Sequence, residues 1–266
     1  MSVLTVCSLS KAFGGVRAVN EVSFAVGRGE FLAMIGPNGA GKSTCFNIIN
    51  GQLQPDSGEI LFEGKNIAGL ALREIWRLGV GRTFQVAATF GSMTVAENVQ
   101  MALISHAGEI YRLWAPAAAL HRERALDLLD QVGMREAADR PSRELAYGDV
   151  KRVELAIALA NEPRLLLMDE PTAGMGARER HELIALVKRL VVERGISVLF
   201  TEHSMDVVFA FADRIIVLAR GRLIADGDAV SIRDNAQVRE VYFGTGKTFA
   251  LGSASQLGSV SQGAAS

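Results

Sequence analysis

The chain has 266 residues, 49% of them hydrophobic, which is enough to bury the core of one large domain or two small ones and excludes disorder throughout. Its 28 basic and 29 acidic residues give a formal net charge of −1, which excludes a general attraction to nucleic acid or to an anionic membrane surface. No apolar run approaches the roughly 20 residues of a membrane-spanning helix, and residues 1–10 lack the pattern of a secretory signal. We therefore expect a cytoplasmic chain that binds no nucleic acid.

Short strand-like runs occupy the first third of the chain, and glycines separate them as turns do. The runs lie at residues 3–6, 22–26, 31–35 and 59–62. They resemble the strands of an antiparallel layer.

The middle of the chain is helical and the remainder alternates. From residue 95 to 132 apolar residues recur at helical spacing, most clearly at Ala125, Leu128, Leu129 and Val132. A further helix is expected at 150–160. The later part alternates between strands and helices, with strands expected at 164–168, 197–201 and 214–218 and helices at 178–192 and 205–211.

This order predicts an α/β fold. Short apolar strands between helices suit a mixed, mainly parallel sheet that is covered on both faces. The helical middle is then an insertion into this core, and the antiparallel layer precedes it. From residue 248 to 266 no residue is charged, and Ser, Gly, Ala and Gln dominate, which is typical of a flexible tail.

The strongest motif matches G-x-x-x-x-G-K-[ST] and directly follows the strand expected at 31–35. Its glycines let successive backbone N–H groups point at a phosphate, and a helix that begins near Lys42 adds its positive end. Lys42 would bridge the β- and γ-phosphates, and Ser43 would hold Mg²⁺. The residues expected to bind the nucleotide in this loop are Gly36, Pro37, Asn38, Gly39, Ala40, Gly41, Lys42, Ser43 and Thr44.

Two carboxylates end the apolar strand expected at 164–168. Asp169 fits the role of a second Mg²⁺ ligand, and Glu170, the next residue, would polarise a water for attack on the γ-phosphate. This pair makes hydrolysis the expected reaction.

With these motifs in place, the sequence resembles the nucleotide-binding subunits of ATP-binding-cassette (ABC) transporters over residues 4–244. The resemblance makes Phe13 the aromatic that stacks on adenine, Gln85 the Q-loop glutamine that contacts Mg²⁺ and takes part in catalysis, and His203 the catalytic switch histidine. It implies a P-loop ATPase fold that binds ATP and Mg²⁺.

The resemblance also implies how this fold is divided along the chain. Residues 1–86 would form the first part of the nucleotide-binding core, and 87–147 a helical subdomain that leads to the signature sequence. Residues 148–244 would form the second part of the core, and 245–266 the flexible tail.

The family signature, Leu-Ser-Gly-Gly-Gln, corresponds here to residues 145–149, where Ala146, Tyr147 and Gly148 would reach the nucleotide of a second subunit. Ala146 lacks the serine hydroxyl, and a hydrogen bond to a charged group is worth about 1.5–3 kcal/mol. Gly176 stands where the family has the aspartate of its D-loop. Both departures favour a second, non-identical ATPase subunit over a homodimer.

Four segments most resemble the ATPase subunits of branched-chain amino-acid uptake systems: LAYG at 145–148, EPTAGM at 170–175, GRTFQ at 81–85 and VREVYFG at 238–244. Such systems contain two transmembrane permeases and a periplasmic or extracellular solute-binding protein. The chain would then lie at the cytoplasmic face of the inner membrane as a peripheral subunit, and Phe90, Met93 and Val95 are candidates for contact with a permease.

Several alternatives share the same nucleotide chemistry. They are importers of urea, amides or aromatic acids, a lipopolysaccharide-type exporter, and a non-hydrolysing regulatory subunit. A soluble ABC ATPase of DNA maintenance would need a long coiled coil between Gln85 and the signature, and the heptads for one are missing there.

Overall fold

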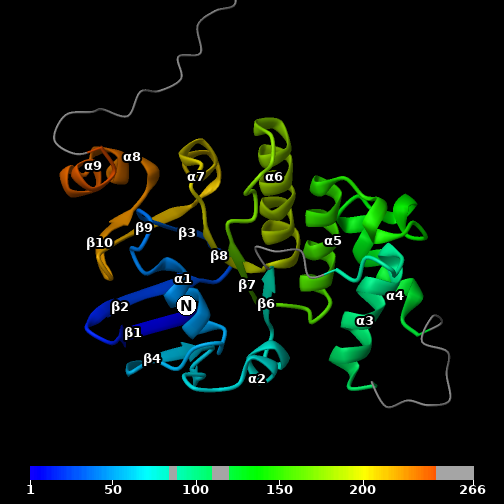
Figure 1. Cartoon of the computed structure of the whole chain (residues 1–266), viewed down its shortest axis with the longest axis horizontal. Helices are drawn as coiled ribbons and strands as arrows, with labels where there is room; N and C mark the ends of the chain where they lie inside the picture. Colours follow the sequence, from blue (N-terminus) through cyan, green and yellow to red (C-terminus); the bar gives the residue numbers. More distant parts are fainter. Residues whose placement is uncertain (84–88, 110–119, 244–266) are drawn as a thin grey trace, which may run out of the picture.

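The structure is a computed structural model that describes residues 1–83, 89–109 and 120–243. Figure 1 shows two β-sheets on one side of the molecule and a lobe of helices on the other. None of the helices in the described ranges combines the length and the apolar character needed to span a bilayer. The strands are β1 Ser2–Phe13, β2 Val16–Gly27, β3 Phe31–Ile35, β4 Ser57–Phe62, β5 Lys65–Asn66, β6 Val80–Thr83, β7 Leu165–Asp169, β8 Ser197–Thr201, β9 Arg214–Ala219 and β10 Arg222–Gly227.

Most α-helices occupy the middle and the later part of the chain; one lies between β3 and β4 and one between β5 and β6. Two short 3₁₀-helices, η2 Arg135–Ala137 and η3 Ser142–Glu144, precede α5. The α-helices are α1 Lys42–Ile49, α2 Leu72–Arg77, α3 Val95–Ala107, α4 Arg122–Gln131, α5 Tyr147–Leu159, α6 Ala177–Arg194, α7 Met205–Phe211, α8 Ala229–Asp234 and α9 Ala236–Phe243.

The two sheets differ as the sequence predicts. The first has the order β2-β1-β4-β5, and its pairs are antiparallel. The second has the order β10-β9-β3-β8-β7-β6 and is parallel except for the edge strand β10. Because parallel strands end at one edge of their sheet, the residues that follow β3, β7 and β8 are brought together there.

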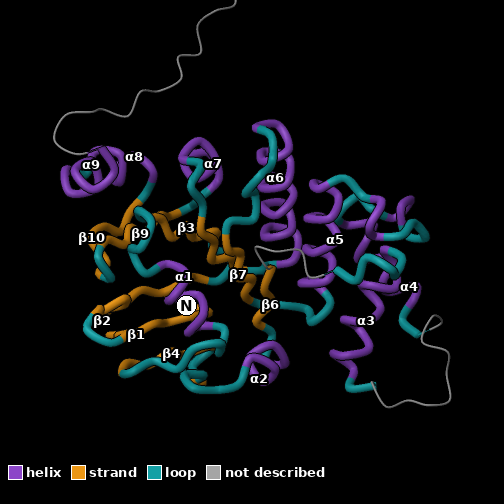
Figure 2. The backbone as a smooth tube through the Cα atoms, viewed as in Figure 1, coloured by secondary structure: helices purple, strands orange, loops and turns teal. Residues whose placement is uncertain are grey.

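Alternation along β3 divides the interior into two cores. Leu32 and Met34 face the antiparallel sheet and α1, whereas Phe31, Ala33 and Ile35 face the helices on the opposite side. Figure 2 shows α1 between the two sheets and α6 and α7 on the far side of the parallel sheet. Both faces of the parallel sheet are therefore covered, which explains why β3 is apolar at every position.

The helical lobe consists of α3, α4 and α5. The α4 stripe predicted from the sequence is buried, since Ala125, Leu128 and Leu129 are 0% exposed and so is Val132, just beyond the helix. Helix α3 begins with a capping box, in which Thr94 accepts from the N–H of Glu97 and the Glu97 carboxylate accepts from the N–H of Thr94. The stripe belongs to the same core cluster as Phe31 of β3 and Leu166 of β7, which places the lobe beside the sheet, whereas the cap stabilises the start of α3.

Candidate functional site

The loop between β3 and α1 is shaped by its glycines. Gly36 has φ 155° and Gly41 has φ 103°, values that favour glycine. A Cβ at Gly36 would lie 2.2 Å from the carbonyl oxygen of Leu218, and one at Gly41 would lie 2.3 Å from that of Ala18. The loop is thus pressed against neighbouring backbone, and side chains are excluded at both positions.

Lys42 starts α1, as the sequence predicts, and its side chain turns back over the loop. The ammonium donates to the carbonyl oxygens of Gly36 at 2.7 Å and Pro37 at 3.1 Å. Burial lowers the pKa of Lys42, and the charges of Glu170 and Asp169 act in the opposite direction. A buried ammonium that is held by two carbonyls and lies near two carboxylates is a suitable partner for a phosphate.

The loop borders a pocket of about 410 Å³. Phe13, at the end of β1, forms part of its wall and is 49% exposed, with the Lys11 ammonium 5.8 Å from its ring centroid. The ring is therefore available for stacking. The pocket is lined by Phe13, Ala18, Asn38, Gly39, Ala40, Gly41, Lys42, Ser43, Thr44 and Glu170.

Asp169 and Glu170 have different surroundings although they are adjacent. Asp169 ends β7 and is 8% exposed, and its Oδ1 accepts a hydrogen bond from the Thr201 hydroxyl at 2.7 Å. Glu170 leaves the strand with φ 49°, an unusual conformation for a non-glycine residue that occurs often at functional sites. Its N–H donates to the Thr201 hydroxyl at 3.0 Å.

His203 meets Glu170 at the edge of the pocket. Its Nε2 lies 2.8 Å from the Oε1 of Glu170, and the imidazole is 49% exposed. A carboxylate that lines the pocket and contacts a half-exposed imidazole can orient a water and take its proton. The structure thus brings Phe13, the loop, Glu170 and His203 to one place.

Gln85 lies outside the described residues, so its predicted role stays a prediction. The signature does lie within them, but α5 begins at Tyr147 and not at residue 150 as the sequence suggested. The extended Ala146 is the N-cap, with φ −64° and ψ 153°. Tyr147 and Gly148 therefore belong to the first helical turn, where their N–H groups have no partner within the helix.

The signature packs against the segment that follows Glu170. A Cβ on Gly174 would lie 3.7 Å from Cε1 of Tyr147, and one on Gly148 would lie 3.6 Å from Cε of Met175. Gly176, the second departure from the family pattern, caps α6, and its N–H donates to the Glu179 carboxylate at 3.3 Å. Both departures therefore lie on adjoining segments.

Sequence reasoning missed Thr201, whose hydroxyl holds both carboxylate residues. The partnership follows from the register, because Asp169 and Thr201 are paired on neighbouring parallel strands. Glu202 was also missed: its buried carboxylate accepts from the hydroxyl of Thr172 at 2.6 Å. The sequence signal for both residues was their position at or just after the end of a strand. Only the pairing of β7 with β8 brings these strand ends together.

We expect Thr201→Val to destabilise the folded chain by about 1–3 kcal/mol, because it leaves buried polar groups of Asp169 and Glu170 without this partner. Urea denaturation measures the loss. Thr83→Val is the matched control, since Thr83 is also a buried strand threonine and its hydroxyl makes no hydrogen bond within the described chain. Equal losses in the two variants would contradict this role of Thr201.

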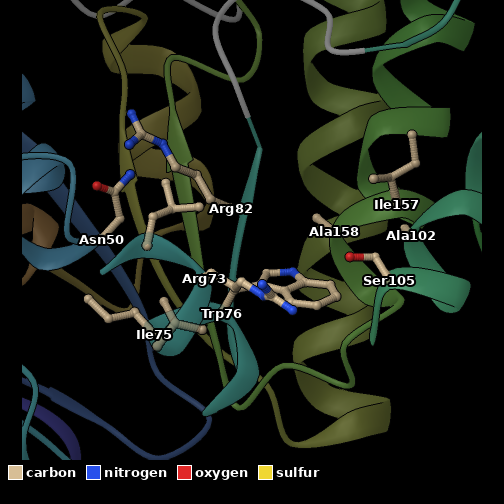
Figure 3. A pocket seen from close by; sticks show the side chains of 11 residues that line it. Asn50, Arg73, Ile75, Trp76, Arg82, Ala102, Ser105, Ile157 and Ala158 are labelled. Carbon is tan, nitrogen blue, oxygen red and sulfur yellow. The ribbon is translucent and has the colours of Figure 1, made fainter. Parts of the chain in front are cut away.

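A second cavity, the inter-lobe groove, has a volume of about 310 Å³ and lies between α2 and β6 on one side and α3 and α5 on the other. Figure 3 shows Trp76 reaching from α2 toward α3, where its ring meets the ring of His106 edge-on at 5.3 Å. The groove is lined by Asn50, Leu72, Arg73, Ile75, Trp76, Val80, Arg82, Ala102, Ser105, Ile157 and Ala158.

The candidates for permease contact are not all accessible. Val95 is 0% exposed and belongs to the core of the helical lobe, so the prediction that it lies on a contact surface is wrong. It opens the apolar stripe of α3, and the same periodicity directs it inward. Phe90 is 57% exposed and Met93 is partly exposed; neither lines the inter-lobe groove.

Comparison with known proteins gives consistent matches along the chain. A family model described as ABC transporter matches residues 19–173. The high-affinity branched-chain amino acid transport ATP-binding protein BraF of Pseudomonas aeruginosa is 39% identical over 249 residues, which cover 91% of this chain and 98% of that protein. The corresponding LivG protein of Escherichia coli K12 is 37% identical over 252 residues, with the same shares.

Solved structures agree with these matches. A nucleotide-free ATP-binding cassette from an ABC transporter has a TM-score of 0.83 at 33% identity and covers 92% of this chain and 100% of its own. A dimeric cassette in a post-hydrolysis state, bound to ADP and phosphate, has a TM-score of 0.72 at 29% identity and covers 85% and 98%.

Proposed function

The chain belongs to the ABC transporter family, and from this membership we propose that it is the ATP-hydrolysing subunit of an importer for branched-chain or related hydrophobic amino acids. The observation that carries the proposal is the contact of Glu170 with His203 at the edge of the pocket that the phosphate loop borders. The solute class rests on the relatives, which are named for branched-chain amino acid transport.

ATP is expected to fill the pocket beside the loop. Phe13 would stack on the base, the loop N–H groups would surround the phosphates, and Lys42 would exchange its two carbonyl partners for phosphate oxygens. Glu170 would then accept the proton of the attacking water while His203 holds the carboxylate in place. Each of these steps uses a contact or an exposed group of this chain.

The donor set of the site fits Mg²⁺. Ser43 offers an exposed hydroxyl next to Lys42, and Asp169 offers the carboxylate oxygen that Thr201 does not occupy. Oxygen donors of this kind, combined with substrate phosphates, are what Mg²⁺ requires in proteins. We propose that Ser43 and Asp169, with Gln85 from outside the described residues, hold the ion, which would neutralise charge on the phosphates.

The chain is expected to work as one half of an ATPase pair. Because Ala146 has no hydroxyl and Gly176 has no carboxylate, this chain can make fewer contacts with the nucleotide bound by a second subunit. We therefore propose a non-identical second subunit with a complete signature, which makes the two nucleotide sites unequal.

Two permeases complete the membrane assembly, and a solute-binding protein outside the membrane delivers the amino acid to them. The inter-lobe groove, apolar along most of its lining, is the surface we propose for the permease. This chain would be peripheral, at the cytoplasmic face of the inner membrane.

Phe13→Ala is expected to weaken ATP binding by about 1–3 kcal/mol, the range measured for loss of one base-stacking aromatic. Isothermal calorimetry on the purified chain measures the change, and Phe13→Tyr should retain the affinity. Phe90→Ala controls for the loss of an exposed phenylalanine elsewhere. An unchanged affinity in Phe13→Ala would contradict the stacking role.

The function itself is tested by uptake. Cells that lack this chain should lose ATP-dependent uptake of labelled leucine, isoleucine or valine and regain it with the wild-type chain but not with Glu170→Gln. Unaltered uptake of all three in the deleted cells would contradict the proposed solute class.

A further inference from the structure

Arg82 contacts two sites of functional interest, the inter-lobe groove and the Asp169 carboxylate. It stands on β6 next to the end of that strand and lines the inter-lobe groove. Its guanidinium also lies 3.8 Å from Oδ2 of Asp169, and the Arg82 side chain is only 12% exposed. One side chain therefore connects the groove with the carboxylate at the end of β7. Figure 3 shows its guanidinium on the side of Asn50.

The guanidinium is also attached to the helix that follows the phosphate loop. Its Nη1 and Nη2 each donate to Oδ1 of Asn47 at 3.2 Å, and Nη1 donates to Oε1 of Gln52 at 3.0 Å. Asn47 belongs to α1, five residues after Lys42. Arg82 thus contacts the loop's helix on one side and Asp169 on the other.

The charges of Arg82 and Asp169 explain why the guanidinium responds to what binds at the carboxylate. Oδ1 of Asp169 is taken by the Thr201 hydroxyl, so Oδ2 is the oxygen that faces Arg82. Burial lowers the pKa of Arg82, and the charge of Asp169 acts in the opposite direction. A cation that reached Asp169 would compete with the guanidinium for the same negative charge.

Arg73 provides a contrast within the same groove. It stands on α2, is exposed, and lines the groove as Arg82 does. Within the described ranges no ion pair or hydrogen bond joins Arg73 to Asp169. The two arginines share the groove but not the link to the carboxylate.

We propose that Arg82 is a positioning residue that couples the inter-lobe groove to the Asp169 carboxylate. When the charge at Asp169 is neutralised from the nucleotide side, the carboxylate no longer attracts the guanidinium of Arg82. The guanidinium then shifts away from Asp169, toward Asn47 and the groove wall. An occupant of the groove that moves Arg82 changes, in return, the charge around Asp169, since such coupling is reciprocal. That the occupant is a permease segment rests on the proposed function. The link between the groove and Asp169 rests on the contacts of Arg82 alone.

Trp76 is a reporter of the groove wall, because it lines the same cavity. The chain has two tryptophans, and replacing the other one by Trp114→Phe leaves Trp76 as the single emitter. The experiment titrates this full-length variant with ADP, once with Mg²⁺ and once with a chelator, and follows Trp76 emission while calorimetry measures binding in parallel.

We expect Mg²⁺ with ADP to shift the emission, and ADP with the chelator to give less than half of that shift. Adding Arg82→Gln should remove at least half of the Mg²⁺-dependent shift while nucleotide still binds, and adding Arg73→Gln should leave the shift unchanged. Equal shifts with and without Mg²⁺ in the chain that retains Arg82 would overturn the proposal, even if Arg82→Gln failed to fold.

The outcomes separate this inference from the proposed function. Nucleotide binding with a full shift in Arg82→Gln, or an equal loss in Arg73→Gln, would overturn the coupling alone. Absence of nucleotide binding to the folded chain that retains Arg82 would overturn the proposed function and the coupling together.

Discussion

Glu170→Gln is expected to bind ATP with nearly unchanged affinity and to hydrolyse it about 10²–10⁴ times more slowly, the range that general base catalysis contributes. The amide keeps the size of the side chain and a hydrogen bond to His203, which now lies 2.8 Å from Oε1. It cannot accept a proton from water. Steady-state phosphate release and equilibrium ATP binding, measured on the same preparation, separate the two effects.

Glu162→Gln is the control for this substitution. Glu162 is an exposed glutamate that pairs with Arg124 at 2.8 Å, away from the pocket. It should hydrolyse ATP at the wild-type rate. If Glu170→Gln also kept the wild-type rate, Glu170 would not be the base.

Lys42→Met is expected to weaken ATP binding about a hundredfold or more. The substitution keeps most of the side-chain length but removes the ammonium, and charge-assisted hydrogen bonds to phosphate are worth about 1.5–3 kcal/mol each. The same ammonium now bonds the Gly36 and Pro37 carbonyls, so the variant should also be less stable without nucleotide. Calorimetry and thermal denaturation measure the two losses.

Lys188→Met serves as the comparison, because Lys188 pairs with Asp213 on a distant surface of α6. Its ATP affinity should match the wild type. Retained affinity in folded Lys42→Met would mean that the ammonium does not contact the phosphates.

Apolar strands and loop motifs were well predicted because their signal is local. Strands β3 and β8 and helix α7 have the expected bounds. A polar or glycine residue marks at least one end of each: Glu30 and Gly36 flank β3, Glu202 follows β8 and Ser204 precedes α7. Strands β1 and β2 are longer than expected. Their pairing contains register shifts, which break the alternation that sequence analysis uses.

Helices α2, α8 and α9 were not anticipated, because they are short and depend on tertiary packing for their stability. The early start of α5 has a similar cause. Ala146 caps the helix through its backbone conformation and no side-chain bond, so the residue types that usually announce an N-terminus are missing.

The site was predicted where one segment carries the chemistry, and missed where two segments share it. Lys42, Asp169 and Glu170 stand in contiguous motifs. Thr201 and Arg82 act through partners that are distant along the chain, and only the pairing of β6, β7 and β8 brings them together. The prediction of Val95 as a surface residue failed because Val95 belongs to the apolar stripe of α3 that packs into the core.

The most direct test of the account is ATP-driven uptake by the complete assembly. The chain would be reconstituted in vesicles with its permeases and the second ATPase subunit, and accumulation of labelled leucine would be measured with solute-binding protein outside and ATP inside. The account predicts that accumulation requires both ATPase subunits and is lost in Glu170→Gln. It also predicts that the chain alone hydrolyses ATP far more slowly than the assembly. Full accumulation without the second subunit, or with Glu170→Gln, would contradict it.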